Sequence, residues 1–288
     1  MPNRDYVSSE VFLKNKSTYS YDSFIFGSSR TMGFKTKSWK QYFPNSVSPF
    51  VFDGLNESIY GIHKKITYLN NNKTKIKNCL IIICPGTTFA RETNHPGHLG
   101  IKHPTISGTS WFNFYKVALI DYYKIDFLKE YLQFLITHKF TPSMSGYIIN
   151  EKITSDNITN DGWLFGKENE ILNNPTKYYS LRKQIFYARD GILKFTPQKI
   201  TAKQLTMLNE IKTVLNKQHT NYKIIISPLY DQIKFNDKDF KKLKNIFGDS
   251  KVFDFSGINR FTQKKEYYYE SAHYRPILGD SLMKIIYK

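Results

Sequence analysis

The sequence predicts an α/β protein, a three-layer α/β/α sandwich around a mostly parallel sheet of roughly five strands. Short, continuous apolar runs are typical of strands that are buried on both faces of a parallel sheet, and here they alternate with stretches of helical periodicity. The chain has 288 residues and a hydrophobic fraction of 40%, so it can bury a large core without disulfides or metals. We expect one domain over residues 1–288.

The first half of the sandwich is predicted from three strands and one helix. The strands are expected at residues 23–26, 49–52 and 79–84, and the last of these reads CLIIIC. Apolar residues at helical spacing predict a helix over residues 57–69, which three consecutive asparagines end.

The second half repeats the alternation of helix and strand. We expect strands at 223–226 and 252–255, and helices at Ala202–Lys217, at Asp237–Phe247 before Gly248, and from Pro276 onward. Repetition of this kind predicts right-handed crossovers and helices on both faces of the sheet.

Residues 89–199 interrupt this alternation, and we expect them to form a long insertion that covers the carboxyl edge of the sheet or acts as a lid. The insertion has a His/Pro/Gly segment, an aromatic-rich stretch with helical character at 111–137, and then a polar, Asn-rich stretch. The helical stretch begins with an aromatic cluster of Trp111, Phe112, Phe114 and Tyr115. We expect this cluster to pack in a core or lid rather than to bind a sugar ring.

The net charge of +18 favours an anionic partner. The lysines are scattered and form no recognisable nucleic-acid module, so we expect no nucleic-acid partner. Cys79 and Cys84 lie on one expected strand and point to opposite faces, which predicts two buried thiols without a disulfide and leaves the redox compartment open. We expect no membrane-spanning segment, because no stretch is long and apolar enough, and we expect no signal peptide at the start of the chain.

Small hydroxyl-bearing residues follow the first expected strand, in the sequence FIFGSSRT. Ser28 and Ser29 suit a turn or a helix N-cap. In a parallel sheet, however, ligands bind beyond the carboxyl ends of the strands, so a serine there is also a candidate nucleophile.

A histidine with a nearby carboxylate follows the last expected strand, in the sequence ESAHYRPILGD. Glu270 precedes His273 by three residues, and across a tight turn its carboxylate can bond the imidazole Nδ1 and leave Nε2 to face a serine. We therefore expect a triad of Ser29, His273 and Glu270. Asp254 is the alternative orienting acid, and Asp280 is expected to support the terminal helix.

These two blocks resemble those of the SGNH/GDSL hydrolase-like superfamily, with Ser29 at the nucleophile position and His273 as the base. The likeness covers about residues 21–84 and 201–288 and not the insertion. It is strongest to bacterial envelope proteins related to the D-alanyl-transfer protein of teichoic acid and to the alginate-acetylation proteins. The resemblance implies a flavodoxin-like strand order and a serine esterase or O-acyltransferase that needs no cofactor.

The resemblance also implies an oxyanion hole, for which we expect the backbone N–H groups of Ser29 and Gly54 together with Thr88. The family has an Asn in the loop after the third strand, whereas this chain has Pro85-Gly86-Thr87-Thr88, so Thr87 or a backbone N–H is the alternative third donor. The orienting acid is Glu270 where the family usually has Asp.

Arg30, His98 and His103 are the residues that we expect to contact substrate, with a structural salt bridge as the alternative for Arg30. A metal site at His95, His98 and His103 is an alternative to a substrate-facing or structural loop, and we predict no metal. The resemblance implies a cell-surface polysaccharide or similar anionic polymer as substrate, a membrane-bound acyl-donor partner, and an extracytoplasmic or membrane-associated location. A catalytically inactive scaffold that binds a glycan or a partner protein is the second hypothesis.

Overall fold

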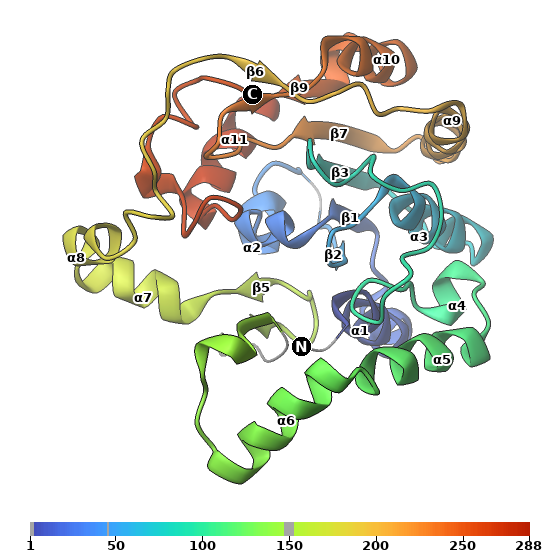
Figure 1. The fold of residues 1–288 in the computed structure, drawn as a ribbon. Helices are drawn as coiled ribbons and strands as arrows, with labels where there is room; N and C mark the ends of the chain where they lie inside the picture. Colours follow the sequence, from blue (N-terminus) through green and yellow to red (C-terminus); the bar gives the residue numbers. More distant parts are fainter. Residues whose placement is uncertain (1–2, 45, 147–152) are drawn as a thin grey trace.

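A computed structural model describes residues 3–44, 46–146 and 153–288 of the chain. Its centre is a five-stranded sheet in the order β2-β1-β3-β7-β9, in which every neighbouring pair is parallel (Figure 1). The strands are β1 (Ser23–Gly27), β2 (Pro49–Asp53), β3 (Asn78–Ile83), β7 (Asn221–Ile226) and β9 (Val252–Asp254). The predicted α/β class and the parallel sheet are confirmed, and all five strands lie where the apolar runs predict them.

Helices cover both faces of the sheet. One face carries α1 (Arg4–Tyr19), α3 (Ile59–Asn71), α9 (Ala202–Lys217) and α10 (Asp237–Phe247), and the other carries α2 (Thr36–Lys40) and α11 (Pro276–Ile286). Successive strand residues point to opposite faces. Phe24 and Phe26 therefore join the first core, while Ile25 between them joins the second. Three layers follow from this alternation.

Helix α1 is absent from the sequence-based prediction. Its surface is largely polar, and only four of its residues are buried, of which Phe12 alone is a large apolar side chain. Asn3 caps the helix by accepting a hydrogen bond from the Tyr6 amide at 3.0 Å. Phe12 then stacks on Phe52 of β2, with 5.1 Å between ring centroids, which anchors α1 to the sheet.

The insertion adds short elements to the sandwich. They are α4 (Pro104–Ser107), α5 (Trp111–Tyr122), α6 (Ile125–Thr137), η2 (Pro142–Gly146), β4 (Thr154–Ser155), β5 (Gly162–Trp163), α7 (Phe165–Asn173), α8 (Pro175–Ser180) and β6 (Lys194–Phe195). β4 pairs with β5, and β6 pairs with β8 (Ile233–Lys234). The aromatic stretch that we expected to be helical forms two helices, α5 and α6, that follow one another along the lower edge of the view in Figure 1.

The expected packing of the aromatic cluster at the start of α5 is wrong for three of its four residues. Phe114 is buried, but Trp111, Phe112 and Tyr115 are exposed. The reason is that α5 lies at the periphery of the molecule, where only one side of the helix meets the protein.

A third apolar cluster joins the insertion to the rest of the protein. It combines Met32 from η1 (Ser29–Gly33), Leu164 and Ile171 from the α7 region, Tyr178 and Tyr179 from α8, and Tyr269 from the loop before α11. This cluster connects the segment after β1 with the segment after β9.

Two further sequence predictions can be compared with the fold. Cys79 and Cys84 are both buried free thiols, as expected. Among the residues that the structure describes, no helix has both the length and the apolar character needed to cross a membrane.

Candidate active site

The turn after β1 presents Ser29 at the carboxyl edge of the sheet. Gly27 has φ of +156°, and a Cβ there would lie 2.9 Å from the Ile82 carbonyl oxygen, so the close approach of β3 requires glycine. Ser28 points inward, with its Oγ 3.0 Å from Cys84 Sγ. Ser28 is the N-cap of η1, because its side chain accepts from the Arg30 amide. The side chain of Ser29 points instead toward His273, on the loop before α11.

His273 lies on a hairpin-like loop between β9 and α11. Tyr268 and Tyr274 form an antiparallel bridge, and the Tyr269 amide donates to the His273 carbonyl at 2.9 Å. The tight turn brings Glu270 and His273 to the same end of the loop, as their spacing predicts.

Ser29, His273 and Glu270 form a continuous hydrogen-bonded chain. Ser29 Oγ lies 2.7 Å from His273 Nε2, and His273 Nδ1 bonds to Glu270 Oε1. The side chains of His273 and Glu270 are 27% and 28% exposed, so solvent reaches them. A hydroxyl, an imidazole and a carboxylate in this order are the arrangement that activates a serine for nucleophilic attack.

Glu270 is the acid that meets His273, and the two other acids considered lie elsewhere. Asp254 pairs with Lys234 at 2.8 Å and accepts hydrogen bonds from Ser256. Asp280 is exposed on α11.

The environment of Glu270 keeps its carboxylate ionised at neutral pH. Burial acts to raise the pKa, but the hydrogen bond and charge of His273, together with nearby Lys167, outweigh it and lower the pKa from 4.5 to about 2. Lys167 Nζ lies 3.6 Å from Glu270 Oε2. The carboxylate of Glu270 is therefore negatively charged beside the imidazole at neutral pH.

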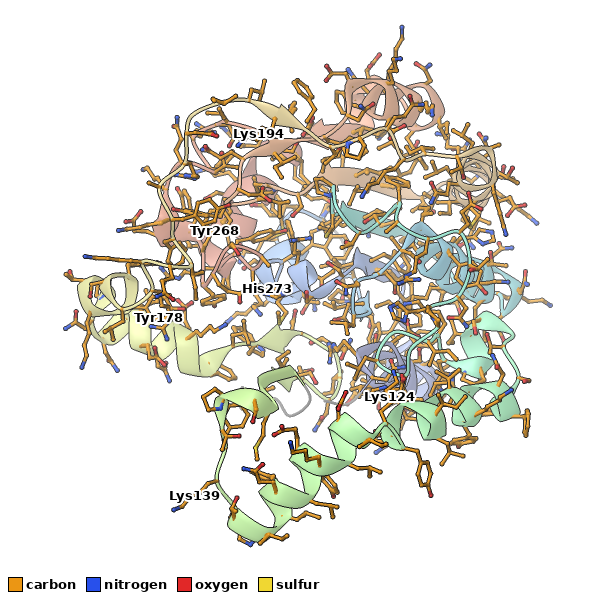
Figure 2. The ribbon with its side chains drawn as sticks, viewed as in Figure 1. Lys124, Lys139, Tyr178, Lys194, Tyr268 and His273 are labelled. Atoms are coloured by element: carbon orange, nitrogen blue, oxygen red, sulfur yellow. The ribbon has the colours of Figure 1, made fainter. Side chains whose placement is uncertain are left out.

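Helices α7 and α8 of the insertion contact the loop that carries His273 and hold it in place. Glu168 of α7 accepts from Arg275 Nη2 at 2.6 Å and from the Tyr269 hydroxyl at 2.6 Å. The Tyr178 hydroxyl of α8 donates to the Tyr269 carbonyl at 2.7 Å, and Figure 2 shows Tyr178, Tyr268 and His273 in this part of the molecule. Contacts on both sides of the turn fix the position of the imidazole.

Arg30 also supports this loop. Its Nε donates to the Ala272 carbonyl at 2.9 Å, which joins the residue after Ser29 to the residue before His273. The guanidinium, expected to contact substrate or to form a salt bridge, thus bonds to the backbone of the base-bearing loop. Ser227 at the end of β7 adds a hydrogen bond of 3.1 Å to the Tyr274 hydroxyl.

Of the three groups that we expected to form an oxyanion hole, the N–H groups of Gly54 and Thr88 already donate hydrogen bonds within the protein, and that of Ser29 has no partner within its helix. Ser29 begins η1, and the first N–H of a helix has no partner within the helix. The Gly54 N–H donates to the Gly27 carbonyl at 3.2 Å. The Thr88 N–H donates to the Cys84 carbonyl at 3.1 Å, and its hydroxyl accepts from the Cys84 amide at 2.9 Å. Among the described residues, the Thr87 hydroxyl is buried without a hydrogen-bond partner.

Gly54 has a structural reason to be glycine. A Cβ at this position would lie 2.6 Å from Glu57 Oε2 and 3.1 Å from both Asp5 Oδ2 and Lys102 Nζ. These groups belong to a buried network of charges, which the backbone at Gly54 approaches closely.

His98 and His103 pair with other parts of the chain. His98 Nδ1 lies 2.8 Å from Asp121 Oδ2, and the fully buried His103 has its Nε2 2.8 Å from Glu10 Oε1 of α1. Within the described ranges, no group of three or more His, Cys, Asp or Glu side chains has the arrangement of a metal site. Both histidines therefore attach their loop to neighbouring helices, His98 to α5 and His103 to α1.

A scan against protein-family models finds no match, and no curated protein matches the chain.

Sequence reasoning missed Lys167 and Glu168, the two residues of α7 that contact Glu270 and the loop around it. Both lie in a polar stretch where lysine, glutamate and asparagine are abundant. The one available signal is the helix N-terminus near Phe165, and it does not indicate which side chains point toward the sheet.

Proposed function

We propose that the protein is a serine hydrolase or O-acyltransferase of the SGNH type, acting through Ser29, His273 and Glu270. The observation that carries this proposal is the 2.7 Å contact between Ser29 Oγ and His273 Nε2, formed by side chains 244 positions apart. The orienting hydrogen bond from Nδ1 to an ionised Glu270 supports it.

The geometry supports a two-step acyl transfer. Ser29 Oγ attacks the acyl carbonyl carbon while His273 Nε2 takes the hydroxyl proton, and Glu270 stabilises the resulting imidazolium. The tetrahedral intermediate then collapses as His273 gives that proton to the leaving oxygen. Water or a sugar hydroxyl attacks the acyl-serine and loses its proton to His273, and His273 then gives that proton to Ser29 Oγ as the bond to the acyl carbon breaks and the product leaves.

The resemblance to the SGNH family supplies the proposed substrate class, and the charge of the chain is compatible with it. The acyl-bearing partner is a cell-surface polysaccharide or a similar anionic polymer, which a chain of net charge +18 attracts. A membrane-bound partner supplies the acyl group when the reaction is a transfer, and the site of action is the bacterial cell envelope.

A pair of matched serine variants tests the proposal. Ser29→Ala should reduce turnover of p-nitrophenyl acetate at least about a thousandfold and should abolish labelling by a fluorophosphonate. Ser28→Ala removes only an N-cap and a contact with Cys84, so it should keep the labelling. Full turnover by the Ser29→Ala protein would refute the proposal.

A non-catalytic scaffold that binds a glycan or a partner protein is the second candidate. The engaged N–H groups of Gly54 and Thr88 favour it, because an oxyanion hole needs donors directed at the substrate oxygen. The same probe separates the two functions, since a folded wild-type protein that binds an anionic glycan and takes no label at Ser29 would be a scaffold.

A further inference from the structure

Helices α5 and α6 present an apolar surface to solvent. Phe112, Tyr123, Ile125 and Ile136 have relative exposures of 79%, 73%, 81% and 80%. Single exposed apolar residues are ordinary, but a continuous group of large side chains on adjacent elements marks an interaction surface.

The most exposed of these residues lie on one stripe of each helix, while Tyr115, Ile120 and Leu135 are exposed beside the stripes. On α5 and its C-cap the stripe contains Phe112, Leu119 and Tyr123, and in α6 it contains Ile125, Leu132 and Ile136. Both sets have spacings of seven and four residues, which place their members on one side of an α-helix. We call these two stripes together the α5–α6 apolar face.

One side of α6 exposes apolar residues where an ordinary surface helix exposes polar ones, although Asp126 in the first turn is exposed as well. Glu130, on the opposite side from the apolar stripe, is buried and accepts a hydrogen bond from Ser143 Oγ at 3.0 Å. A helix side that exposes isoleucine and leucine is suited to a surrounding less polar than water.

The other side of α5 is fastened to the body of the protein. Phe114 stacks on Tyr6 of α1 at 5.6 Å, and Trp111 meets His103 edge-on at 5.3 Å. His98 also pairs with Asp121 at 2.8 Å. These contacts set the orientation of α5 and leave its apolar stripe directed outward.

The charge around the α5–α6 apolar face suits an anionic surface. Lys116, Lys124, Lys129 and Lys139 are all exposed. Lys124 and Lys139 flank the two ends of α6 (Figure 2). Of the acids on these helices, Asp121 is paired with Lys124 at 2.6 Å, Glu130 is buried, and Asp126 in the first turn of α6 is exposed. Lysines beside an apolar stripe can place their ammonium groups among phosphate headgroups while their stems lie along the acyl region.

The net charge also decides between two possible occupants of this face. A second copy of the chain carries the same charge of +18, so two copies repel each other at long range. An anionic lipid surface attracts the same charge, and exposed tyrosines and a tryptophan are the residues that favour the boundary between headgroups and acyl chains.

We propose that the α5–α6 apolar face docks on the surface of a membrane that contains anionic phospholipid, with α5 and α6 lying in the plane of the interface. This inference concerns attachment and does not depend on the triad. It assigns to the insertion a binding surface remote in sequence from Ser29 and His273.

Vesicle sedimentation tests the docking. Wild-type protein should sediment with vesicles of phosphatidylglycerol and phosphatidylcholine, and salt should weaken the binding. Ile125→Asp/Ile136→Asp should lower the partition coefficient by about tenfold or more. Ile192→Asp changes an isoleucine that is 64% exposed outside this face, so it is the matched control and should bind like wild type. Far-UV circular dichroism checks that each variant is folded.

Tryptophan quenching locates the contact. Trp111 is 41% exposed next to the stripe of α5, so brominated phosphatidylglycerol should quench it, and the Trp111→Phe protein should lose that quenching while still binding. Three results would overturn the proposal: no binding of wild type to anionic vesicles, equal binding to pure phosphatidylcholine, or undiminished binding of the double variant. Dimerisation that the double variant abolishes would assign the face to a second copy and overturn it as well.

Discussion

Glu270 shows how one side chain adapts to the loop that carries it. It lies three residues before His273 across a tight turn, and its longer side chain still reaches the imidazole Nδ1. Its other oxygen faces Lys167 at 3.6 Å. The same carboxylate therefore orients the base and receives support from the insertion.

Replacing Glu270 with Gln should reduce stability in a pH-dependent way. The pKa of Glu270 is lowered from 4.5 to about 2, so its stabilising contribution is complete above pH 4.5 and is lost as the pH falls toward 2. Because the group is partly exposed, we expect the difference in the free energy of unfolding at pH 7 to be about 1 kcal/mol. Urea unfolding of both proteins from pH 3 to 7 measures it.

The neighbouring exposed acid Glu266 provides the control for this comparison. Glu266→Gln should change the free energy of unfolding less than Glu270→Gln does at pH 7. A difference for Glu270→Gln that grows as the pH falls below 4.5 would contradict the assigned direction of the pKa shift.

At the scale of elements, α7 connects the insertion to the candidate catalytic loop. The pKa of Glu168 is lowered, because hydrogen bonds from Arg275 and Tyr269 outweigh the effect of burial, which acts to raise it. The helix thereby places one carboxylate against two residues that flank Glu270 and His273. If the triad is catalytic, Glu168 is a positioning residue.

Glu168→Gln should lower kcat about tenfold or more and leave KM nearly unchanged, since a displaced imidazole slows proton transfer without altering substrate contacts. Glu170→Gln is the matched control, because Glu170 is on the same helix and pairs with Arg182 at 2.7 Å, away from the loop. Steady-state kinetics with a soluble ester measures both variants. Equal kinetics for the Glu168 and Glu170 variants would show that the contacts of Glu168 with Arg275 and Tyr269 have no role in positioning the imidazole.

The elements differ in how well the sequence predicts them, and the difference has a physical cause. The central strands have continuous apolar runs and the sandwich helices have apolar faces, so the sequence predicts that these elements are buried. Ser29 and His273 follow two such strands, and the parallel topology brings them together. Helix α1 buries mainly small or polar residues, among them Asp5 and Ser8, so no apolar periodicity marks it. The roles of Gly54 and Glu168 depend on contacts with distant segments, which local patterns do not encode.

At the scale of the whole molecule, a buried network of four charges joins three parts of the chain. Asp5 comes from α1, Glu57 from the segment just before α3, Lys65 from the interior of α3, and Lys102 from the insertion. All four side chains are at most 4% exposed. Two carboxylates against two ammonium groups balance the charge, which is the condition under which buried ions are tolerated.

Removing one member of this network should destabilise the entire fold. Lys65→Met leaves two buried carboxylates with one ammonium group, and we expect a loss of about 3–5 kcal/mol in the free energy of unfolding. Lys64→Met, the adjacent and partly exposed position, should stay within about 0.5 kcal/mol of wild type. Urea unfolding at pH 7 compares the two, and equal stabilities would show that the network is not coupled to folding.

The pH dependence of the network follows from two shifts of opposite direction. Burial acts to raise the pKa of Asp5, but Lys102 and Lys65 lower it well below 3.8, so its contribution is present above pH 3.8 and is lost as the pH falls below that value. Burial acts to lower the pKa of Lys102, but Asp5 and Glu57 raise it above 10.5, so its contribution is present below pH 10.5 and is lost only at higher pH. In the folded wild type Asp5 therefore stays ionised and Lys102 stays protonated from about pH 5 to 9, so urea unfolding of wild type across that window should show a nearly constant contribution of the network to its unfolding free energy. A steep change inside that window would mean that a different protonation state holds α1, α3 and the insertion together.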